Sequence, residues 1–181
     1  DYLTLDDALA CVDPKLTEKT TGEYGMPYWF TVDYGGVNDR SALEVAHVVP
    51  GTDEVIVDRL DCWQGTHANP VEIDIQPNGV RSIEGWIEER AKGFPRVAGI
   101  VLDPNQLQAL GWRLQRRGFN VIFFEYDGGK NNQRMAQLLQ SHVRSKKVRW
   151  SSQAGFLPGA KDETFAQEIE SLVLRVMPYG Y

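Results

Sequence analysis

The chain has 181 residues and a formal net charge of −6, with 42% hydrophobic and 24% charged side chains. This length suits one well-cored domain with an additional arm, and the composition is that of an ordinary globular protein. No apolar run approaches the roughly 18 residues of a membrane span, and no basic-then-apolar leader of the secretory kind is present. The chain begins at Asp1 rather than Met, so we expect a piece of a longer protein.

Charged side chains and cysteines both bear on function. Residues 1–110 carry 8 basic and 19 acidic side chains, whereas residues 111–150 carry 9 basic and 2 acidic ones. Such a chain can combine metal-binding carboxylates with a phosphate-facing surface, although a basic segment can equally be a solvated helix face.

Cys11 and Cys62 match no metal or redox spacing, so we expect free thiols in a reducing cytosol.

In chain order, the sequence "LTLDDALACVD" predicts a short helix, and "PKLTEKTTGEYG" predicts a linker. Three strands follow, at Tyr28–Tyr34, Ala42–Val49 and Glu54–Trp63, and the turns between them predict antiparallel hairpins. The stretch "QGTHANPVEIDIQPNG" predicts an irregular arm, and a helix is expected over residues 80–93.

After Pro95 the pattern changes from hairpins to an alternation of strands and helices. The runs "RVAGIVLD" and "FNVIFFEY" are continuously apolar, as is typical of strands buried on both faces of a sheet. Helices are expected in "PNQLQALGWRLQRRG", in "GGKNNQRMAQLLQSHVRSKK" and in "DETFAQEIESLVLRVM", with a short edge strand at "VRW".

This order of elements predicts an α/β fold of the ribonuclease-H-like type. The mixed sheet would have about five strands, three antiparallel and then parallel ones, with helices on both faces. Right-handed crossovers place the fourth strand beside the first. A generic α/β sandwich is the other assignment that the order allows.

Two aspartates end the two strands that this topology makes neighbours. Asp33 closes the first strand, in "TVDYGG", and Asp103 closes the fourth, in "GIVLDPNQ". Ligands collect outside the carboxyl ends of such strands, and two converging carboxylates need a proton or a cation between them. Hard oxygen ligands favour Mg²⁺ or Mn²⁺, and two such ions can hydrolyse a phosphodiester.

Each aspartate also has a purely structural interpretation. Asp33 could begin an Asx-type turn, and Asp103 could belong to a helix N-cap. Asp39 could bind the second ion, but a structural role, capping the hairpin with Asn38 and pairing with Arg40, is favoured.

The stretches "VDYGGVNDRSALEVAHV", "VIVDRLDCWQG" and "RVAGIVLDPNQLQALGWRLQRRGFNVIFFEY" together resemble the C-terminal nuclease domain of the large terminase subunit of tailed bacteriophages. Members of this family are ATP-driven motors that package viral DNA and cut it to length. The resemblance implies that residues 1–25 form the linker from a preceding ATPase domain and residues 26–181 the nuclease. The chain contains no GxxxxGK[ST] phosphate loop, so that ATPase would be missing from this piece.

The resemblance also implies a site and its partners. Asp33 and Asp103 become the first and second metal-binding carboxylates. The third usually lies in an Asp-Asp or His-Asp-Asp motif after a late helix, and no such motif follows "TFAQEIESLVLRVMPYGY". The third acid is therefore expected beyond Tyr181, or else at Asp162. Double-stranded DNA, the ATPase domain, the portal and the small terminase subunit are the implied partners, in the host cytoplasm.

Basic residues are the candidates for contacting DNA phosphates without reading sequence. They are Arg113, Arg116, Arg117, Lys130, Arg144, Lys146 and Lys147. The leading hypothesis is a metal-dependent DNA endonuclease, and the alternative is a non-catalytic DNA-clamping module whose site is incomplete.

Overall fold

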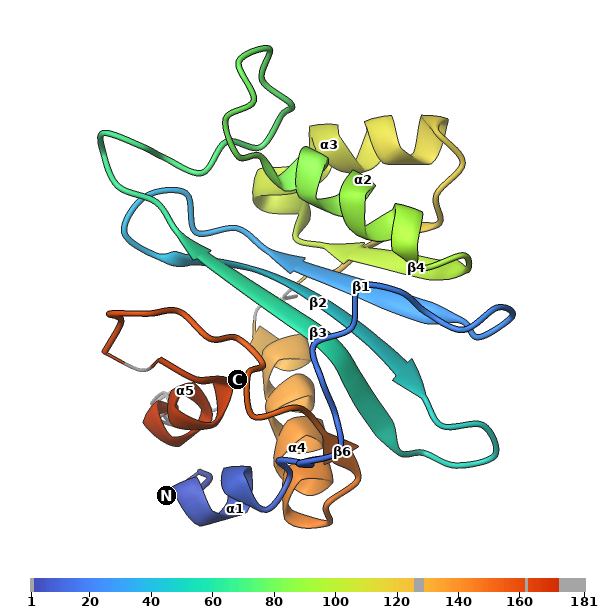
Figure 1. Cartoon of the computed structure of the whole chain (residues 1–181), viewed down its shortest axis with the longest axis vertical. Coiled ribbons are helices and arrows are strands. Elements are labelled where there is room, and N and C mark those ends of the chain that lie inside the picture. Colours follow the sequence, from blue (N-terminus) through green and yellow to red (C-terminus); the bar gives the residue numbers. More distant parts are fainter. Residues whose placement is uncertain (1, 126–128, 162, 173–181) are drawn as a thin grey trace.

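A mixed six-stranded sheet in the order β5-β4-β1-β2-β3-β6 runs through the molecule (Figure 1). The computed structural model describes residues 2–125, 129–161 and 163–172. The strands are β1 (Tyr28–Asp33), β2 (Arg40–Val48), β3 (Val55–Gln64), β4 (Val97–Leu102), β5 (Val121–Phe123) and β6 (Val148–Arg149). β2 is antiparallel to both β1 and β3, whereas β4 is parallel to β1 and β5, and β6 is parallel to β3.

Helices cover both faces of this sheet. They are α1 (Leu5–Leu9), α2 (Ile83–Gly93), α3 (Pro104–Arg116), α4 (Lys130–Arg144) and α5 (Phe165–Ser171). Figure 1 shows α2 and α3 on one side of the sheet, and α4 with α1 and α5 on the other. No helix among the described residues is long and apolar enough to cross a lipid bilayer.

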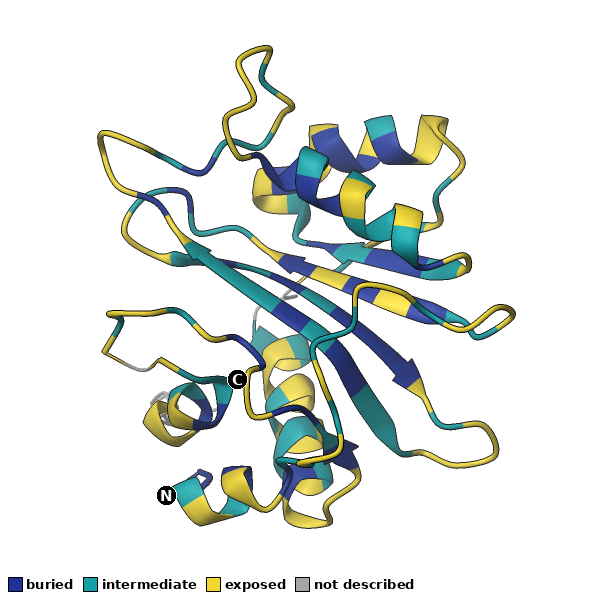
Figure 2. Ribbon diagram, in the orientation of Figure 1, coloured by how far each residue is buried: buried dark blue, intermediate teal, exposed yellow. Residues whose placement is uncertain are grey.

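The alternation of side chains along the strands produces two separate cores. In β1, Tyr28, Phe30 and Val32 are buried against the layer of α2 and α3, and the residues between them are exposed. The second core lies on the opposite face and includes Trp150 and Val143, together with side chains of α1 and α5. Figure 2 shows the buried stripes along the central strands. Residues on one strand therefore face different layers according to their parity.

The predicted ribonuclease-H-like architecture is confirmed, with corrections to its extent. The sheet has six strands rather than about five, because Val148–Arg149 pairs with β3. β5 is limited to Val121–Phe123, shorter than the apolar run "FNVIFFEY" predicted. α5 begins at Phe165 and ends at Ser171, since Leu172 has extended backbone, and residues 173–181 lie outside the described part.

The first residues belong to the packed structure rather than extending from it. Thr4 caps α1 with a capping box, and Ala8 and Cys11 are buried in the second core. Val12 forms an isolated parallel bridge with Trp150. That residues 1–25 link this unit to an ATPase domain stays a prediction.

Core packing on the central strands should dominate stability. Replacing Ile100, which is fully buried on β4, by alanine should lower the free energy of unfolding by about 2–5 kcal/mol. The matched change Ile122→Ala, on the neighbouring strand at a 38% exposed position, should cost much less. Urea denaturation of both variants checks this, and equal losses would contradict the assigned core.

Candidate active site at the carboxyl ends of β1 and β4

The parallel register of β1 and β4 brings two aspartates to the same edge of the sheet. Val32 pairs with Leu102, so the next residues on the two chains are Asp33 and Asp103. Neighbouring strands lie about 4.8 Å apart, which leaves little room to separate two carboxylates at equivalent positions. The topology thus juxtaposes the two residues predicted to hold a cation.

Asp103 has a structural role as well as its place at the edge. It is the N-cap of α3, and its Oδ1 accepts a hydrogen bond from the backbone N–H of Asn105 at 2.9 Å. Pro104 occupies the first helical position, where its missing N–H costs nothing. The cap fixes the orientation of the Asp103 carboxylate by one oxygen, and the second oxygen can contact a ligand.

The surroundings of Asp33 change the pKa of its carboxyl group. Its pKa is raised, chiefly because the surrounding protein removes water from the carboxylate, although the residue is exposed at the sheet edge. The negative charges of Asp103 and Asp39 raise the pKa further, and a hydrogen bond from the backbone of Tyr34 opposes the shift. A cation at this position would relieve the repulsion.

The turn between β1 and β2 is held by close backbone contacts. A Cβ on Gly35 would lie 2.4 Å from the carbonyl oxygen of Arg40, so a side chain there would force the turn open. The N–H of Gly35 donates to Ser41 Oγ at 3.0 Å. Asn38 has a positive φ of 68°, which asparagine tolerates well. These features keep the exposed Asp39 near Asp33.

Arg40 connects this turn to the last helix. Its Nη1 lies 3.0 Å from Glu168 Oε2 on α5. The sequence placed Arg40 with Asp39, its neighbour in the chain, and gave no indication of a partner 128 residues away. The ion pair brings α5 to the edge at which Asp33 lies.

Glu44 is a functional candidate that sequence reasoning missed. It pairs with Thr31 across β1 and β2, two positions from the pair of Asp33 and Ala42, and so faces the same side of the sheet as Asp33. Burial raises the pKa of Glu44 to about 7. The signal was present, because a glutamate interrupts the apolar strand "ALEVAHVV" as Asp33 interrupts its own strand.

The donor set fits a divalent cation only in part. Asp33 and Asp103 supply hard carboxylate oxygens, and the mutual repulsion that raises the pKa of Asp33 suits a cation between them. Among the described residues, however, no three histidine, cysteine or acidic side chains form a group that could hold a metal. Asp162, the candidate third acid, lies outside the described residues, whereas its neighbour Glu163 accepts a hydrogen bond from Gly159 N–H at 3.0 Å.

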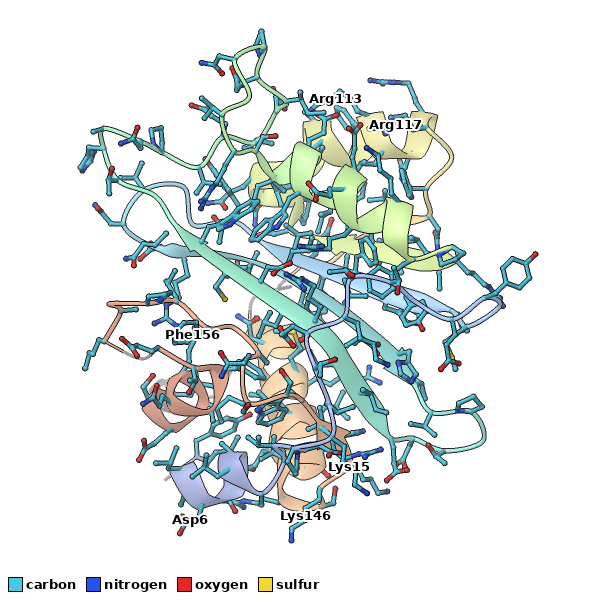
Figure 3. The ribbon with its side chains drawn as sticks, in the orientation of Figure 1. Asp6, Lys15, Arg113, Arg117, Lys146 and Phe156 are labelled. Atoms are coloured by element: carbon cyan, nitrogen blue, oxygen red, sulfur yellow. The ribbon has the colours of Figure 1, made fainter. Side chains whose placement is uncertain are left out.

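Several of the basic candidates are paired with acidic side chains. Arg113 contacts Asp74 and also Glu84, the latter at 3.3 Å, and Arg117 contacts Glu88. These pairs tie α3 to α2 and to the loop before it. In Figure 3, Arg113 and Arg117 lie at the opposite end of the molecule from Lys146. The seven candidates therefore do not form one continuous surface.

Of the remaining basic candidates, Arg116 ends α3, and the others lie on or beside α4. Lys147 pairs with Asp53 at 2.8 Å, and Arg144 donates to the backbone oxygen of Tyr2 at 3.2 Å. In the described part of the chain, Arg116, Lys130 and Lys146 are exposed and form no ion pair.

The coupling between the two aspartates can be measured directly. Replacing Asp103 by asparagine keeps an oxygen that can cap α3 but removes the charge, so the pKa of Asp33 should fall. Titration of the Asp33 carboxyl carbon by NMR checks the direction. Asp74→Asn, which removes a charge that pairs with Arg113, should leave the pKa of Asp33 unchanged. An unchanged pKa in Asp103→Asn would show that the two carboxylates do not interact.

Glu44 should make stability depend on pH. Its folded pKa of about 7 lies above its ordinary value of 4.5, so the folded state binds the extra proton between these values. The contribution of protonated Glu44 to the free energy of unfolding is fully present below about pH 4.5 and is lost as the pH rises through 7. Glu44→Gln should therefore be more stable than the wild type at pH 8, by up to about 3 kcal/mol, with little difference at pH 4.5. Urea unfolding at both pH values tests this, and a pH-independent difference would contradict it.

Comparisons with solved structures give this arrangement a context. The large terminase nuclease from thermophilic phage G20c with bound zinc superposes with a TM-score of 0.61 at 13% identity, over 98% of this chain and 90% of that one. The HK97 bacteriophage large terminase gives a TM-score of 0.58 at 13% identity, over 84% of this chain and 34% of that one. The G20c nuclease with bound magnesium gives 0.57 at 12% identity, over 82% and 74%.

Sequence comparison alone finds no relative. No profile of a known protein family matches the chain, and no curated protein matches it. The chain spans about a third of the length of the large terminases of phages D6E and HK97. What these comparisons establish is that the chain has the ribonuclease-H-like fold of large terminase nuclease domains.

Proposed function

We propose that this chain is the divalent-metal-dependent DNA endonuclease domain of a phage terminase, cutting concatemeric viral DNA during packaging. The observation that carries the proposal is the register that places Asp33 and Asp103 side by side at the ends of two parallel strands. Its support is the shared fold and the zinc, cobalt and magnesium bound by the G20c nuclease.

Asp33 and Asp103 would hold the ions, two Mg²⁺ or Mn²⁺. Bound there, the ions would supply Lewis-acid stabilisation of the phosphodiester and lower the pKa of a water nucleophile. One oxygen of Asp103 accepts the hydrogen bond from Asn105 N–H, which orients the carboxylate. The other oxygen would be the one that binds an ion. Asp33 binds an ion as the carboxylate, and its pKa is raised chiefly by loss of water, so ion binding should weaken as the pH falls.

Further ligands are part of the proposal. Asp39 contributes to the second ion, since its charge already acts on Asp33. The third carboxylate is Asp162 or lies beyond Tyr181. The position beyond Tyr181 agrees with a family arrangement in which the last acid follows a late helix, whereas Asp162 precedes α5 in the chain.

DNA would reach the site through charge rather than through base contacts. Arg116, Lys130 and Lys146 are exposed, and they would bind backbone phosphates directly. Arg113, Arg117, Arg144 and Lys147 would have to exchange their present contacts for phosphates. Binding of this kind weakens steeply as salt is added.

The proposed setting is the packaging motor in the host cytoplasm. The ATPase domain of the same subunit, the portal and the small terminase subunit are the proposed partners. One observation favours a second function, a non-catalytic DNA-clamping module: the described residues contain no group of three metal-binding side chains.

Nicking of supercoiled plasmid in Mn²⁺, in Mg²⁺ and in EDTA tests the proposal. The wild-type chain should nick in Mn²⁺ or Mg²⁺ but not in EDTA, and Asp33→Asn and Asp103→Asn should lose at least about 100-fold, the scale of removing a key electrostatic group. Asp6→Asn is the matched control, because Asp6 is an exposed carboxylate on α1 that pairs with none of the proposed DNA-binding residues in the described part of the chain.

Two outcomes would redirect the proposal. Equal nicking by the aspartate variants, or nicking in EDTA, would exclude the two-metal mechanism. If this chain binds DNA without nicking it, and a chain with a longer C-terminus does nick, the site in this chain is incomplete.

A further inference from the structure

Glu18 lies outside the candidate site, on a segment without helix or strand of its own. We call this segment, residues 13–23, the strap. Figure 1 shows it running from the neighbourhood of β6 past β3 towards the start of β1. At one end the N–H of Asp13 donates to the carbonyl of Trp150 at 2.9 Å, and at the other the N–H of Gly22 donates to the carbonyl of Gly93 at 2.9 Å. The strap thus joins the two layers of the molecule.

Glu18 uses both carboxylate oxygens at the centre of the strap. Its Oε1 accepts from the backbone N–H of Leu60 on β3 at 2.9 Å, and its Oε2 accepts from Ser151 Oγ at 2.9 Å. β6 pairs only with Val55 and Ile56, so Leu60 lies beyond the end of the paired edge of β3. Glu18 therefore fastens the residues after β6 to this edge.

The next residue of the strap is anchored just as firmly. The N–H of Lys19 donates to the carbonyl of Asp58 at 3.0 Å, and Lys19 Nζ lies 3.3 Å from Asp58 Oδ1. The Asp58 side chain is fully buried, and its Oδ2 lies 2.6 Å from His47 Nδ1. Releasing Lys19 would leave a buried carboxylate short of charge compensation, which opposes detachment of the strap.

The segment that Glu18 fastens leads to α5. Four residues after Ser151, the N–H of Gly155 donates to the carbonyl of Leu60 at 2.8 Å. The N–H of Phe165, the first residue of α5, donates to the carbonyl of Ala154 at 3.2 Å. The position of α5 therefore depends on the edge of β3 that Glu18 holds.

α5 in turn reaches the candidate site. Glu168 pairs with Arg40 at 3.0 Å, and Arg40 begins β2 two residues before Ala42, which is paired with Asp33 across β1 and β2. The contacts thus run without interruption from the strap to the turn between β1 and β2.

We propose that Glu18 is a positioning residue of the candidate site. By fastening the residues after β6 to β3, it fixes α5, and α5 through Glu168 fixes the turn that carries Asp39 beside Asp33. The inference rests on the proposed function insofar as the site binds a divalent cation. It adds that the N-terminal segment of this chain tunes that binding from a distance.

The hydrogen bonds of the Glu18 carboxylate, rather than its volume, are what the proposal depends on. A carboxylate accepts both hydrogen bonds with its charge, whereas a glutamine amide can accept from Leu60 but presents an N–H to Ser151, so that hydrogen bond must reverse its direction and both lose the charge. Glu18→Gln should therefore lie between the wild type and Glu18→Ala in every effect.

Two measurements on the same variants test the proposal. Glu18→Ala should raise amide hydrogen exchange in residues 151–161 and 163–172 about tenfold, because this segment loses one of its attachments to β3. It should also weaken Mn²⁺ binding, measured by titration calorimetry, by about tenfold, as is typical when a group that orients metal ligands is removed. Thr17→Ala, an exposed change on the same strap, is the matched control and should alter neither.

A variant at the far end keeps the test decisive if Glu18→Ala does not fold. Glu168→Gln breaks the pair with Arg40 without touching the strap. It should weaken Mn²⁺ binding comparably and leave exchange in residues 13–23 unchanged. Combined with Glu18→Gln, its effect should be less than additive, because both changes act through one series of contacts.

The failures of the two proposals are distinguishable. A wild-type chain that binds no Mn²⁺ would overturn the proposed function and this inference together. Wild-type binding with unaltered affinity in Glu18→Ala and Glu168→Gln would overturn the inference alone. Unchanged exchange in residues 151–161 and 163–172 of Glu18→Ala would overturn its first step.

Discussion

The repulsion between two carboxylates that the sheet forces together is the constraint on which the account depends. Asp33 and Asp103 directly follow a register pair of parallel neighbours, so the pairing of β1 with β4 holds their backbones close together. The pKa of Asp33 is raised chiefly by the loss of water around its carboxylate, and the charge of Asp103 raises it further. Under the proposed function a cation between the two carboxylates would relieve this repulsion, and the rest of the molecule supports the strand ends that carry them.

That support comes from both faces of the sheet. On one side, Val32 and Leu102, the residues before the two aspartates, are buried under α2 and α3 and hold the strand ends rigid. On the other side, α5 is linked to the turn after β1 through the pair of Arg40 and Glu168. Gly35 allows that turn to pass closely over the backbone of Arg40. The site is thus built from secondary structure rather than from a loose loop, as pre-organised chemistry requires.

Much of the fold and of the candidate site could be predicted from local sequence patterns. The long-range contacts could not, because local sequence does not encode them. The alternation of apolar runs and turn residues predicted the strands and their order, and with them the meeting of Asp33 with Asp103. Long-range ion pairs left no such trace: nothing local indicates that Arg113 turns to Asp74 and Glu84, or that Arg40 turns to Glu168. Glu44 could have been recognised, because a glutamate inside an apolar strand is as anomalous as Asp33. The short edge strand predicted at "VRW" is present at Val148–Arg149, but local propensity gave no indication that its partner is β3.

The fold is shared with large terminase nucleases although the sequence identity to the G20c enzyme is 13%. The most direct test of the central claim is therefore structural: a crystal of this chain grown with Mn²⁺ and measured at the manganese absorption edge. The expected result is an anomalous peak between Asp33 and Asp103, within coordination distance of an oxygen of each carboxylate. An anomalous peak elsewhere, or a separate ion on each carboxylate with none shared between them, would contradict the claim.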